Sequence, residues 1–471
     1  MTPQDGQHVR RNVWTLSSGD QTIDEYAKAV TVMKGRHPSD PTSWSYQAAI
    51  HGTHATPTKP LWNGCQHGTW FFVAWHRMFI YYFEQIVRAA VAEAGGASNW
   101  ALPYWNYGAG GQQATIPLPF REPTTNGEPN PLYVSQRAQG INSGLALPPP
   151  VASPAHALSR PNFTGTAQFG GGVTPVQQFS GSTGRLEQTP HNDVHSTVGG
   201  RSGWMADIDQ AAEDPIFWLH HANIDRIWFL WASPAHRDPG DTRWTGQRFS
   251  FFDAQGSRVE KTCADVRDIN QLGYTYEGVP APEEQEAAMT TPGEPDDEEA
   301  APELVGASDA PLQLVGSPAQ VAFQIDAKAT AAVLGDAGVT EPGHIYLNVE
   351  DIDAEHNPGT VYGVYINLPE GASAQTAEAH YAGNVSFFGA ERARNPRGDE
   401  HAHSLRVTLE VTELVHELAA AGQWDGQHVN ITFRPLGLIP ADRPDLAHAL
   451  PDTISGSDPP VTIGRVSIFY G

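Results

Sequence analysis

Histidines are the residues of this chain whose type and spacing best suit chemistry. In the middle of the chain, His191 and His195 stand four residues apart. On a helix this spacing places both imidazoles on the same face. A second helical run opens at Pro215, since proline is favoured in a first turn, and it carries His220 and His221. Three imidazoles from two antiparallel helices can hold one metal ion inside a bundle.

A second group of histidines lies nearer the N-terminus and predicts a paired metal site. His51, His67 and His76 follow one another at intervals of 16 and 9 residues. His51 ends a predicted helix, His67 lies in a loop that contains Gly and Pro, and His76 lies on a long apolar helix. His54 lies one turn beyond His51 and is the alternative to it as a ligand. Imidazole donors suit copper, zinc, iron or nickel, so their number alone does not select the metal.

The residues around both groups resemble the two copper motifs of the tyrosinase, catechol oxidase and haemocyanin family. The run A-W-H-R surrounds His76, and the run D-P-I-F-W-L-H-H-A-N-I-D-R-I-W begins at Asp214. The resemblance extends from Arg10 to about Tyr276 and implies two type 3 copper ions, with O2 as the co-substrate. The implied ligands are His51, His67 and His76 for the first ion, CuA, and His191, His195 and His221 for the second, CuB.

The cysteine content bears on one of these ligands. The chain has two cysteines, Cys65 and Cys263, too few for a disulfide framework. A free cysteine is most often a small buried apolar residue, and Cys263 is interpreted in this way. Cys65 stands two residues before His67. The resemblance to fungal tyrosinases and molluscan haemocyanins implies a thioether cross-link between the Cys65 sulfur and the His67 ring.

The resemblance assigns further roles near the metal pair. Glu187 and Asn192 match a catalytic pair that holds a water near the copper, and such a water can act as a general base toward a phenol. Ile208 matches the gate of the substrate pocket over CuB, where its modest size implies an open entrance. Phe217 matches the pocket aromatic packed beneath the metals. His220 matches a histidine that supports the ligands without binding copper itself.

The activity implied by the resemblance is that of a tyrosinase- or catechol oxidase-type polyphenol oxidase. Such an enzyme uses O2 to oxidise o-diphenols to o-quinones, and the Glu187–Asn192 pair favours additional ortho-hydroxylation of monophenols. The copper ligands do not distinguish these activities from those of an o-aminophenol oxidase or a strict catechol oxidase. A haemocyanin-like oxygen carrier is disfavoured because the chain is short and lacks repeats. A metal site used only for binding is disfavoured by the complete set of histidines.

Composition and charge restrict the partners. The 471 residues carry a formal net charge of −25, which argues against nucleic acid or an anionic membrane as a partner. Small phenolic substrates, neutral or cationic, fit this charge. The N-terminus lacks the apolar region of a signal peptide, and no run reaches the about 18 apolar residues of a membrane span. The prediction is a soluble cytoplasmic protein, bacterial by its Ala-, Gly- and Arg-rich composition, whose oligomeric state the sequence leaves open.

The sequence predicts two domains and a linker. Residues 1–278 are expected to form a mainly α catalytic domain, in which a four-helix bundle with long loops holds the two coppers. Residues 279–310 are dense in Pro, Glu, Asp and Ala and predict a linker without ordered structure. Residues 311–471 contain short β-branched and aromatic runs that predict an antiparallel β-sandwich. This part resembles the domain that follows the copper domain in polyphenol oxidases, which implies a lid that keeps the enzyme latent and inserts one side chain above the coppers.

The spacing of apolar residues places the elements within these domains. Gly108–Gly184 shows little periodicity and is expected to form surface loops around the site. The adjacent charges of Asp225 and Arg226 are interpreted as a structural ion pair. The predicted helices are Ile23–Met33, Trp44–His51, Thr69–Gly95 and Thr412–Ala421, and the predicted strands are Ile345–Val349, Val361–Leu368, Asn384–Phe388, Leu405–Val411, His428–Phe433 and Val461–Tyr470.

Overall fold

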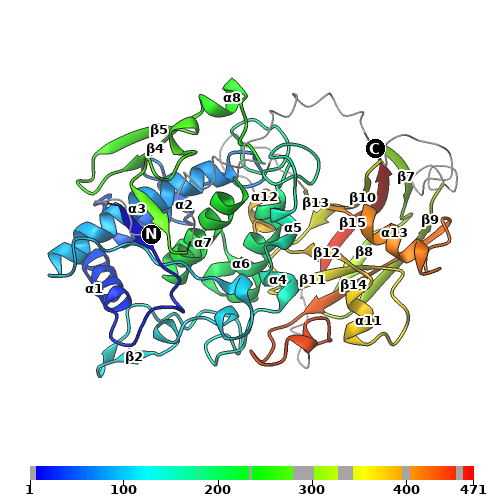
Figure 1. The fold of residues 1–471 in the computed structure, drawn as a ribbon, viewed down its shortest axis with the longest axis horizontal. Coiled ribbons are helices and arrows are strands. Elements are labelled where there is room, and N and C mark those ends of the chain that lie inside the picture. The colour runs from blue at the N-terminus through cyan, green and yellow to red at the C-terminus, as the bar shows by residue number, and fades with distance from the viewer. Residues whose placement is uncertain are drawn as a thin grey trace.

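The chain contains a helical part followed by a sheet-rich part. The computed structural model describes residues 7–179, 181–232, 236–278, 302–326, 343–394, 404–451 and 460–471. Up to residue 278 the described chain is mainly helical, and from residue 302 onward it is mainly β-sheet. Figure 1 shows the two parts side by side, with the blue-to-green helices on the left and the yellow-to-red strands on the right. Residues 279–301 of the predicted linker lie outside the described residues.

The longer described helices of the first part begin and end at recognisable signals. They are α1 (Thr22–Gly35), α2 (Trp44–His51), α3 (Phe72–Glu93), α6 (Asp193–Gly199) and α7 (Ile216–Trp231). The Ser43 hydroxyl caps α2 by accepting the Tyr46 amide hydrogen, and α7 starts directly after Pro215. α3 ends before Gly95, whose positive φ of 81° suits glycine. The predicted helices of this part are confirmed to within a few residues.

Short elements fill the connections of the first part. Most of Gly108–Gly184, predicted as loops, is irregular, and the described elements within it are two to four residues long. The short elements of the first part are β1 (His8–Arg10), η1 (Tyr107–Ala109), η2 (Gly111–Ala114), η3 (Leu118–Phe120), β2 (Thr124–Thr125), β3 (Glu128–Pro129), α4 (Pro149–Ala152), α5 (Ala155–Leu158), η4 (Glu187–Asn192), η5 (Trp204–Ala206), η6 (Ala211–Glu213), α8 (Thr242–Thr245), β4 (Arg248–Phe252), β5 (Arg258–Thr262), η7 (Ala264–Val266) and β6 (Tyr274–Tyr276).

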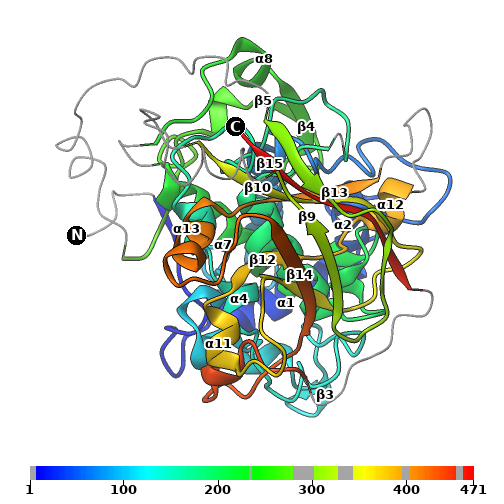
Figure 2. The ribbon, with the colours of Figure 1, turned by 90° about the vertical axis from the view of Figure 1, so that its right-hand side faces the viewer.

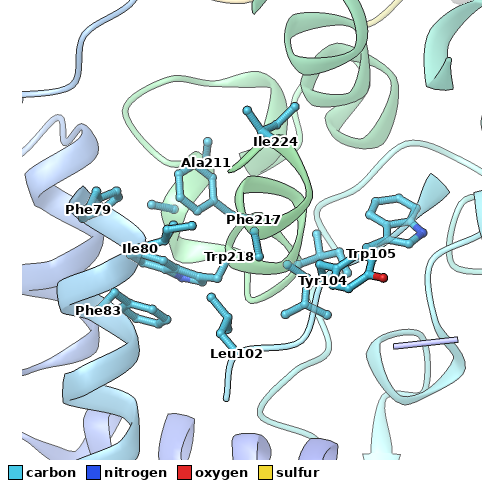
Figure 3. Packing of buried hydrophobic residues seen from close by; sticks show 14 of the residues in the cluster. Phe79, Ile80, Phe83, Leu102, Tyr104, Trp105, Ala211, Phe217, Trp218 and Ile224 are labelled. Carbon is cyan, nitrogen blue, oxygen red and sulfur yellow. The ribbon is translucent and has the colours of Figure 1, made fainter. Parts of the chain in front are cut away.

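Helices α3 and α7 pack against each other through aromatic side chains (Figure 3). The Phe83 and Trp218 rings stack with centroids 3.3 Å apart, and the Phe79 ring lies 4.8 Å from the same indole. Most side chains of both helices are buried, so this contact removes a large apolar area from water. The packing fixes the spacing between His76 on α3 and His221 on α7.

A buried ionic cluster ties the N-terminus to the same two helices. Strand β1 pairs in parallel with β6. Arg10 of β1 donates to Glu84 of α3 at 2.7 Å and to Asp225 of α7 at 3.0 Å. The Tyr276 hydroxyl of β6 donates to the same Asp225 carboxylate at 2.6 Å. Because these charges are paired and hydrogen-bonded, the cluster avoids the penalty of an isolated buried ion.

The predicted ion pair between Asp225 and Arg226 is wrong. Asp225 pairs instead with Arg77 of α3, whose guanidinium also lies 3.6 Å from the ring centre of Trp228. Arg226 lies over the Tyr104 ring at 4.9 Å. Successive residues on a helix point about 100° apart, so adjacent charges do not face each other.

The length of α3 does not make it a membrane span. None of the described helices has both the length and the apolar character that crossing a bilayer requires. α3 is 22 residues long but carries four charged side chains, Arg77, Glu84, Arg88 and Glu93. Two of them, Arg77 and Glu84, belong to the buried ionic cluster.

Two antiparallel sheets form the second part. Their strands are β7 (Glu303–Ala307), β8 (Leu312–Leu314), β9 (Ala319–Gln324), β10 (Ile345–Asp353), β11 (Val361–Ile366), β12 (Tyr381–Val385), β13 (Leu405–Glu410), β14 (His428–Leu436) and β15 (Val461–Tyr470). One sheet has the order β13-β10-β15-β7, with β8 also paired to β15, and the other has the order β12-β11-β14-β9. One hydrophobic cluster takes side chains from both sheets, among them Leu347 of β10 and Phe433 of β14.

Helices of the second part are short and lie between its strands. Figure 2 views this part from its outer side, with the helices of the first part behind it. The predicted helix beginning at Thr412 is confirmed as α13. The helices are α11 (Ala374–Glu378), α12 (Ala390–Arg394), α13 (Thr412–Ala420) and η8 (Pro444–Leu446).

The second part begins earlier than composition predicted. Strand β7 lies within residues 279–310, the predicted linker, and pairs with β15. Three strands, β7 to β9, were not predicted, because pairing to a neighbouring strand rather than local pattern stabilises them. The predicted strand Asn384–Phe388 is displaced: β12 ends at Val385, and Phe388 lies beyond it.

Candidate metal centre

The structure brings seven buried histidines together. All are at most 2% exposed. They are the six predicted ligands and His220. His51 ends α2, His67 lies in the loop before α3, His76 lies on α3, His191 lies in η4, His195 lies on α6, and His220 and His221 lie on α7.

His51, His67 and His76 form the first group of imidazoles. Their ring centroids are separated by 5.2 Å (His51–His67), 5.1 Å (His67–His76) and 5.7 Å (His51–His76). His54, the alternative to His51, has a side chain that is 53% exposed and pairs with Asp207 at 2.8 Å. The geometry therefore favours His51 over His54.

His191, His195 and His221 form the second group. Their ring centroids are 4.6 Å (His191–His195), 5.6 Å (His195–His221) and 5.0 Å (His191–His221) apart. The Nε2 atoms of His195 and His221 lie 3.4 Å apart. Two nitrogens that each bind one ion at about 2.0–2.1 Å would have this kind of separation. The two groups adjoin, because the His76 and His221 rings stack at 4.6 Å.

Hydrogen bonds orient most of these rings through Nδ1. Three of the rings face a backbone carbonyl, and His191 faces the Asn192 side chain at 2.8 Å. A ring oriented in this way presents Nε2 to a metal. The Nε2 atoms of His51, His76 and His191 are buried and have no hydrogen-bond partner among the described residues. The carbonyl pairs are His51–Ile208 (3.0 Å), His76–Phe72 (2.8 Å) and His195–Met205 (2.8 Å).

Burial keeps these imidazoles neutral. It lowers the pKa of His51 to about 3 and lowers the pKa values of His67, His76, His191, His195 and His221 as well, where the neighbouring histidines add to the effect. A neutral imidazole is the form that binds a metal, so no proton has to leave before binding. The donor set, the orphaned Nε2 atoms and the ring spacing fit two metal ions side by side.

His220 lies closer to the second group than its predicted supporting role suggested. Its donor atoms fall within 4.8 Å of those of His191, His195 and His221. Neither ring nitrogen has a hydrogen-bond partner among the described residues. Its ring lies 5.6 Å from the Tyr107 ring. Variants of His220 and His221 therefore form a direct test of the ligand assignment.

Cys65 lies against the first group. It is 1% exposed, and its sulfur falls within 4.8 Å of donor atoms of His51 and His67. The Gln178 amide donates to the sulfur at 3.3 Å. Burial raises the pKa of the Cys65 thiol, so it stays protonated unless it reacts. Its position beside His67 fits the predicted thioether.

Glu187 and Asn192 line one small pocket beside His67. Glu187 accepts the Gly68 amide hydrogen at 2.8 Å through Oε1, while its Oε2 is buried without a hydrogen-bond partner in the described residues. Burial raises the pKa of Glu187 to about 8. The pocket has a volume of about 30 Å³, enough for about one or two waters. An ordered water between Glu187 and Asn192 fits this space.

Phe217 and Ile208 differ in how well they match their predicted places. The Phe217 ring lies 4.2 Å from that of His221 and 4.9 Å from that of His51, so it packs against both groups. Ile208 is 5% exposed and binds His51, a ligand of the first group, through its carbonyl. It lines a different pocket, beside His54. The predicted gate over CuB at Ile208 therefore stays a prediction.

Phe388, from the sheet-rich part, closes the site. Its ring stacks on His195 with centroids 4.1 Å apart and an interplanar angle of 16°. It also lies 5.6 Å from the His67 ring and 5.7 Å from the His191 ring. The sequence predicted that one side chain is inserted but did not identify it. The only local signal is the apolar run that ends at Phe388, and that run by itself favours a strand.

Hydrogen bonds join the two parts close to the site. Asn384 donates to the Asp193 carboxylate and to the Pro150 carbonyl, both at 2.8 Å. Ala146 and Ile439 exchange two backbone hydrogen bonds of 2.7 and 3.0 Å. The sheet-rich part is thus docked by polar contacts as well as by the buried ring.

Comparisons with known proteins agree with this geometry. The common central domain of tyrosinase matches residues 41–233, the polyphenol oxidase middle domain matches residues 238–287, and a domain of unknown function matches residues 301–471. A tyrosinase of Hahella sp. (strain CCB-MM4) is 32% identical over 496 residues, which cover 98% of each chain. Polyphenol oxidase A1 of Vicia faba is 29% identical over 294 residues, covering 56% of this chain and 47% of its own.

Solved structures of other proteins have the same fold over both parts of this chain. The latent apple tyrosinase superposes with a TM-score of 0.63 at 21% identity, covering 100% of this chain and 98% of its own. A latent aurone synthase gives a TM-score of 0.63 at 19% identity, covering 99% and 90%. The fold and the two histidine groups match the tyrosinase family, which is a family of type 3 dicopper proteins. The chain belongs to the tyrosinase and polyphenol oxidase family, whose enzymes are oxidoreductases that act on small phenols.

Proposed function

We propose that this protein is a dicopper oxidase that converts o-diphenols to o-quinones with O2 as co-substrate. The observation that carries the proposal is the pair of adjoining buried imidazole groups with orphaned Nε2 atoms. Bound copper would supply the exchange of two electrons between the phenol and O2. The proposed ligands are His51, His67 and His76 for CuA and His191, His195 and His221 for CuB.

The residues around the ligands hold the site rigid and dry. Backbone carbonyls orient His51, His76 and His195, and Phe217 packs against both groups. Such fixed rings keep the metal geometry ready before substrate binds. The proposed catalytic domain, residues up to 278, thus contributes every ligand from a four-helix bundle of α2, α3, α6 and α7 and the adjoining loops.

The position of Phe388 supports an aromatic substrate. Its benzene ring lies flat against His195 inside the site. When that ring is withdrawn, the space it leaves suits another single aromatic ring. A phenol there would lie beside the proposed CuB ligands and next to the pocket of Glu187 and Asn192.

The test of the proposed function is direct. Copper-loaded protein should bind two coppers per chain and convert catechol to a coloured quinone, followed by absorbance. Zinc-loaded protein is the control and should give no quinone. A protein that binds two coppers but gives no quinone, even after the sheet-rich part has been displaced, would be an oxygen carrier or a binding protein. Comparison of tyramine, dopamine and an o-aminophenol then separates tyrosinase, strict catechol oxidase and o-aminophenol oxidase activities.

Ortho-hydroxylation of monophenols is proposed in addition, because Glu187 and Asn192 line one water-sized pocket. A water held there can accept the phenol proton. Changing Asn192 to Gly should reduce monophenol turnover about 100-fold, the lower end of the range for loss of general-base assistance. Diphenol turnover should fall by a smaller factor, which reflects the lost hydrogen bond to the His191 ring. Steady-state rates with tyramine and dopamine measure the two losses. Equal losses on both substrates would remove the argument for a water-holding pair.

The thioether between Cys65 and His67 is proposed from the burial of the sulfur beside the ring. Forming the bond joins the sulfur to a ring carbon and removes one hydrogen from each, with O2 as the two-electron oxidant, so the intact mass should lie about 2 Da below the mass of the sequence. The Cys65→Ser variant, which cannot form the bond, is the control and should show its full mass. A Cys65 thiol that reacts with an alkylating reagent in denatured, copper-free protein would show that the link is absent.

Latency is proposed as the role of the sheet-rich part, from Glu303 onward, which we interpret as a β-sandwich lid. Phe388 fills the site, and Asn384 fixes the same segment to Asp193. A substrate ring and the Phe388 ring cannot occupy one space. The enzyme with its lid docked should therefore turn over phenols more slowly than the enzyme whose lid is displaced, for example after cleavage between the two parts.

A further inference from the structure

We propose that Phe179 positions the ligand His67, and that it is the contact through which the docked lid holds that ligand in place. The inference rests on the proposed copper site, in which His67 binds CuA. It concerns a residue that lies in the long loop segment and carries no metal-binding group of its own.

Of the proposed ligands, His221 and His67 have no hydrogen-bond partner at Nδ1 among the described residues. His221 is held on helix α7, so His67 is the ligand that lacks both kinds of support. It lies in a loop rather than on a helix, and neither of its ring nitrogens has a hydrogen-bond partner among the described residues. His51, His76, His191 and His195 all have an Nδ1 hydrogen bond. The proposed thioether to Cys65 would fix one edge of the His67 ring, and a contact on the face of the ring is needed to set its tilt.

Phe179 supplies that contact through both its backbone and its ring. Its amide N–H donates to the His67 carbonyl at 2.7 Å. Its ring lies nearly parallel to the imidazole, with an interplanar angle of 12° and centroids 6.2 Å apart. This is an offset stack, a favoured arrangement of two rings. Phe179 is 8% exposed, so the contact is shielded from water.

The backbone at Phe179 is unfavourable for its side chain. Its φ is 55°, in the left-handed region that bulky residues seldom adopt. Such a conformation persists where the surrounding structure imposes it, and it is found most often at functional sites. Gly68 makes the approach possible, because a Cβ there would lie 2.9 Å from the Phe179 Cα. Phe179 and His67 therefore lie together at the cost of an unfavourable backbone conformation at Phe179, and they need a residue without a side chain at position 68.

The lid also contacts the Phe179 ring. A Cβ added to Gly389 would lie 2.5 Å from Cε1 and 2.6 Å from Cζ of Phe179, so the glycine lies directly against the ring. Gly389 follows Phe388, which stacks on His195. Gly389 thus contacts Phe179, which stacks on His67, while Phe388 stacks on His195 and also lies 5.6 Å from the His67 ring. Docking covers the CuB side with Phe388 and holds His67 through Phe179.

The first experiment removes the ring in the full-length, copper-loaded protein and follows copper release to excess EDTA. Phe179→Gly deletes the ring and fits the positive φ, so the backbone is relieved rather than strained. One of the two coppers should leave about tenfold faster, the lower end of the effect of groups that orient metal ligands, and the other at the wild-type rate. Phe179→Tyr keeps the ring and should behave as wild type.

Phe169→Ala is the matched control for this experiment. Phe169 belongs to the same loop segment, but its ring stacks on Trp231 at 4.3 Å instead of on a histidine. It should leave both release rates unchanged. Equal acceleration in Phe169→Ala and Phe179→Gly, or no acceleration in Phe179→Gly, would overturn the proposal. Wild-type protein that binds fewer than two coppers would refute the proposed function instead.

The second experiment tests the lid contact. Gly389→Ala places a methyl group against the Phe179 ring, and the same single copper should again leave faster, by about tenfold. Gly371→Ala is the control, since Gly371 has a similar φ of 70° but nothing within 4 Å of an added Cβ. It shares the backbone strain without the contact. Equal release rates in the two variants would show that the lid does not act through Phe179.

Discussion

His221→Ala should lose the CuB ion and all oxidation of catechol. The imidazole supplies an Nε2 atom 3.4 Å from that of His195, and alanine has no donor to replace it. With one ion left, the site cannot exchange two electrons with O2. Copper content by elemental analysis should fall from about two ions per chain to about one, since metal affinity depends on a complete ligand set.

His220→Ala is the matched control, because the two histidines are adjacent on α7 and both are buried. Its loss should weaken copper binding by about 10–100-fold, as for a group that supports a ligand, without abolishing activity in excess copper. His220 lies within 4.8 Å of the other CuB donors, so the comparison is a stringent one. If His221→Ala retains two coppers, or if CuB is lost only in His220→Ala, then His220 is the CuB ligand and His221 is the supporting residue.

Phe388→Ala should activate the full-length protein. The substitution removes the ring that lies on His195 and weakens lid docking. Loss of a buried Phe side chain costs about 3–5 kcal/mol. If about half of that cost acts on the docked state, the equilibrium shifts toward the open state by about 10–70-fold. The rate with a bulky catechol, at matched copper content, should rise by a similar factor.

Phe387→Ala is the control for general destabilisation of the lid. Phe387 is the adjacent ring, 1% exposed, but it packs in the hydrophobic cluster of the sheets, 6.1 Å from the Tyr362 ring. Phe388→Ala should activate more strongly than Phe387→Ala, and its gain should be largest for bulky substrates. Two results would argue against a lid. One is a Phe388→Ala rate equal to that of the wild-type protein. The other is an equal rate for the full-length protein and for a protein that lacks the residues after Val279.

Local sequence determined the parts of this protein that depend on neighbouring residues. The four-residue spacing of His191 and His195 and the apolar run around His76 follow from the geometry of one helix. The starts of α2 and α7 depend on Ser43 and Pro215, which act on the next turn. The motifs around these histidines also carried the family resemblance, so the order of the residues alone indicated the histidines that the structure brings together.

Tertiary structure alone decided the contacts between distant segments. Asp225 pairs with Arg10 and Arg77 rather than with its neighbour, because only the packed helices bring those charges within reach. Strand β7 forms because β15 offers it backbone partners. These partners are far apart in the chain, so the spacing of apolar and polar residues does not indicate which of them pair.

The contacts made by the lid show most clearly what could not be predicted from the sequence. A single Phe among many apolar residues has no local mark that separates a core side chain from one inserted into a site. Phe388 and Phe179 acquire their roles only where the sheets dock on the helices, against His195 and His67. The sequence by itself indicated the histidines that are proposed to bind copper. The docking of the two parts decided which residues lie against those histidines, because such contacts depend on surfaces that exist only after both parts have folded.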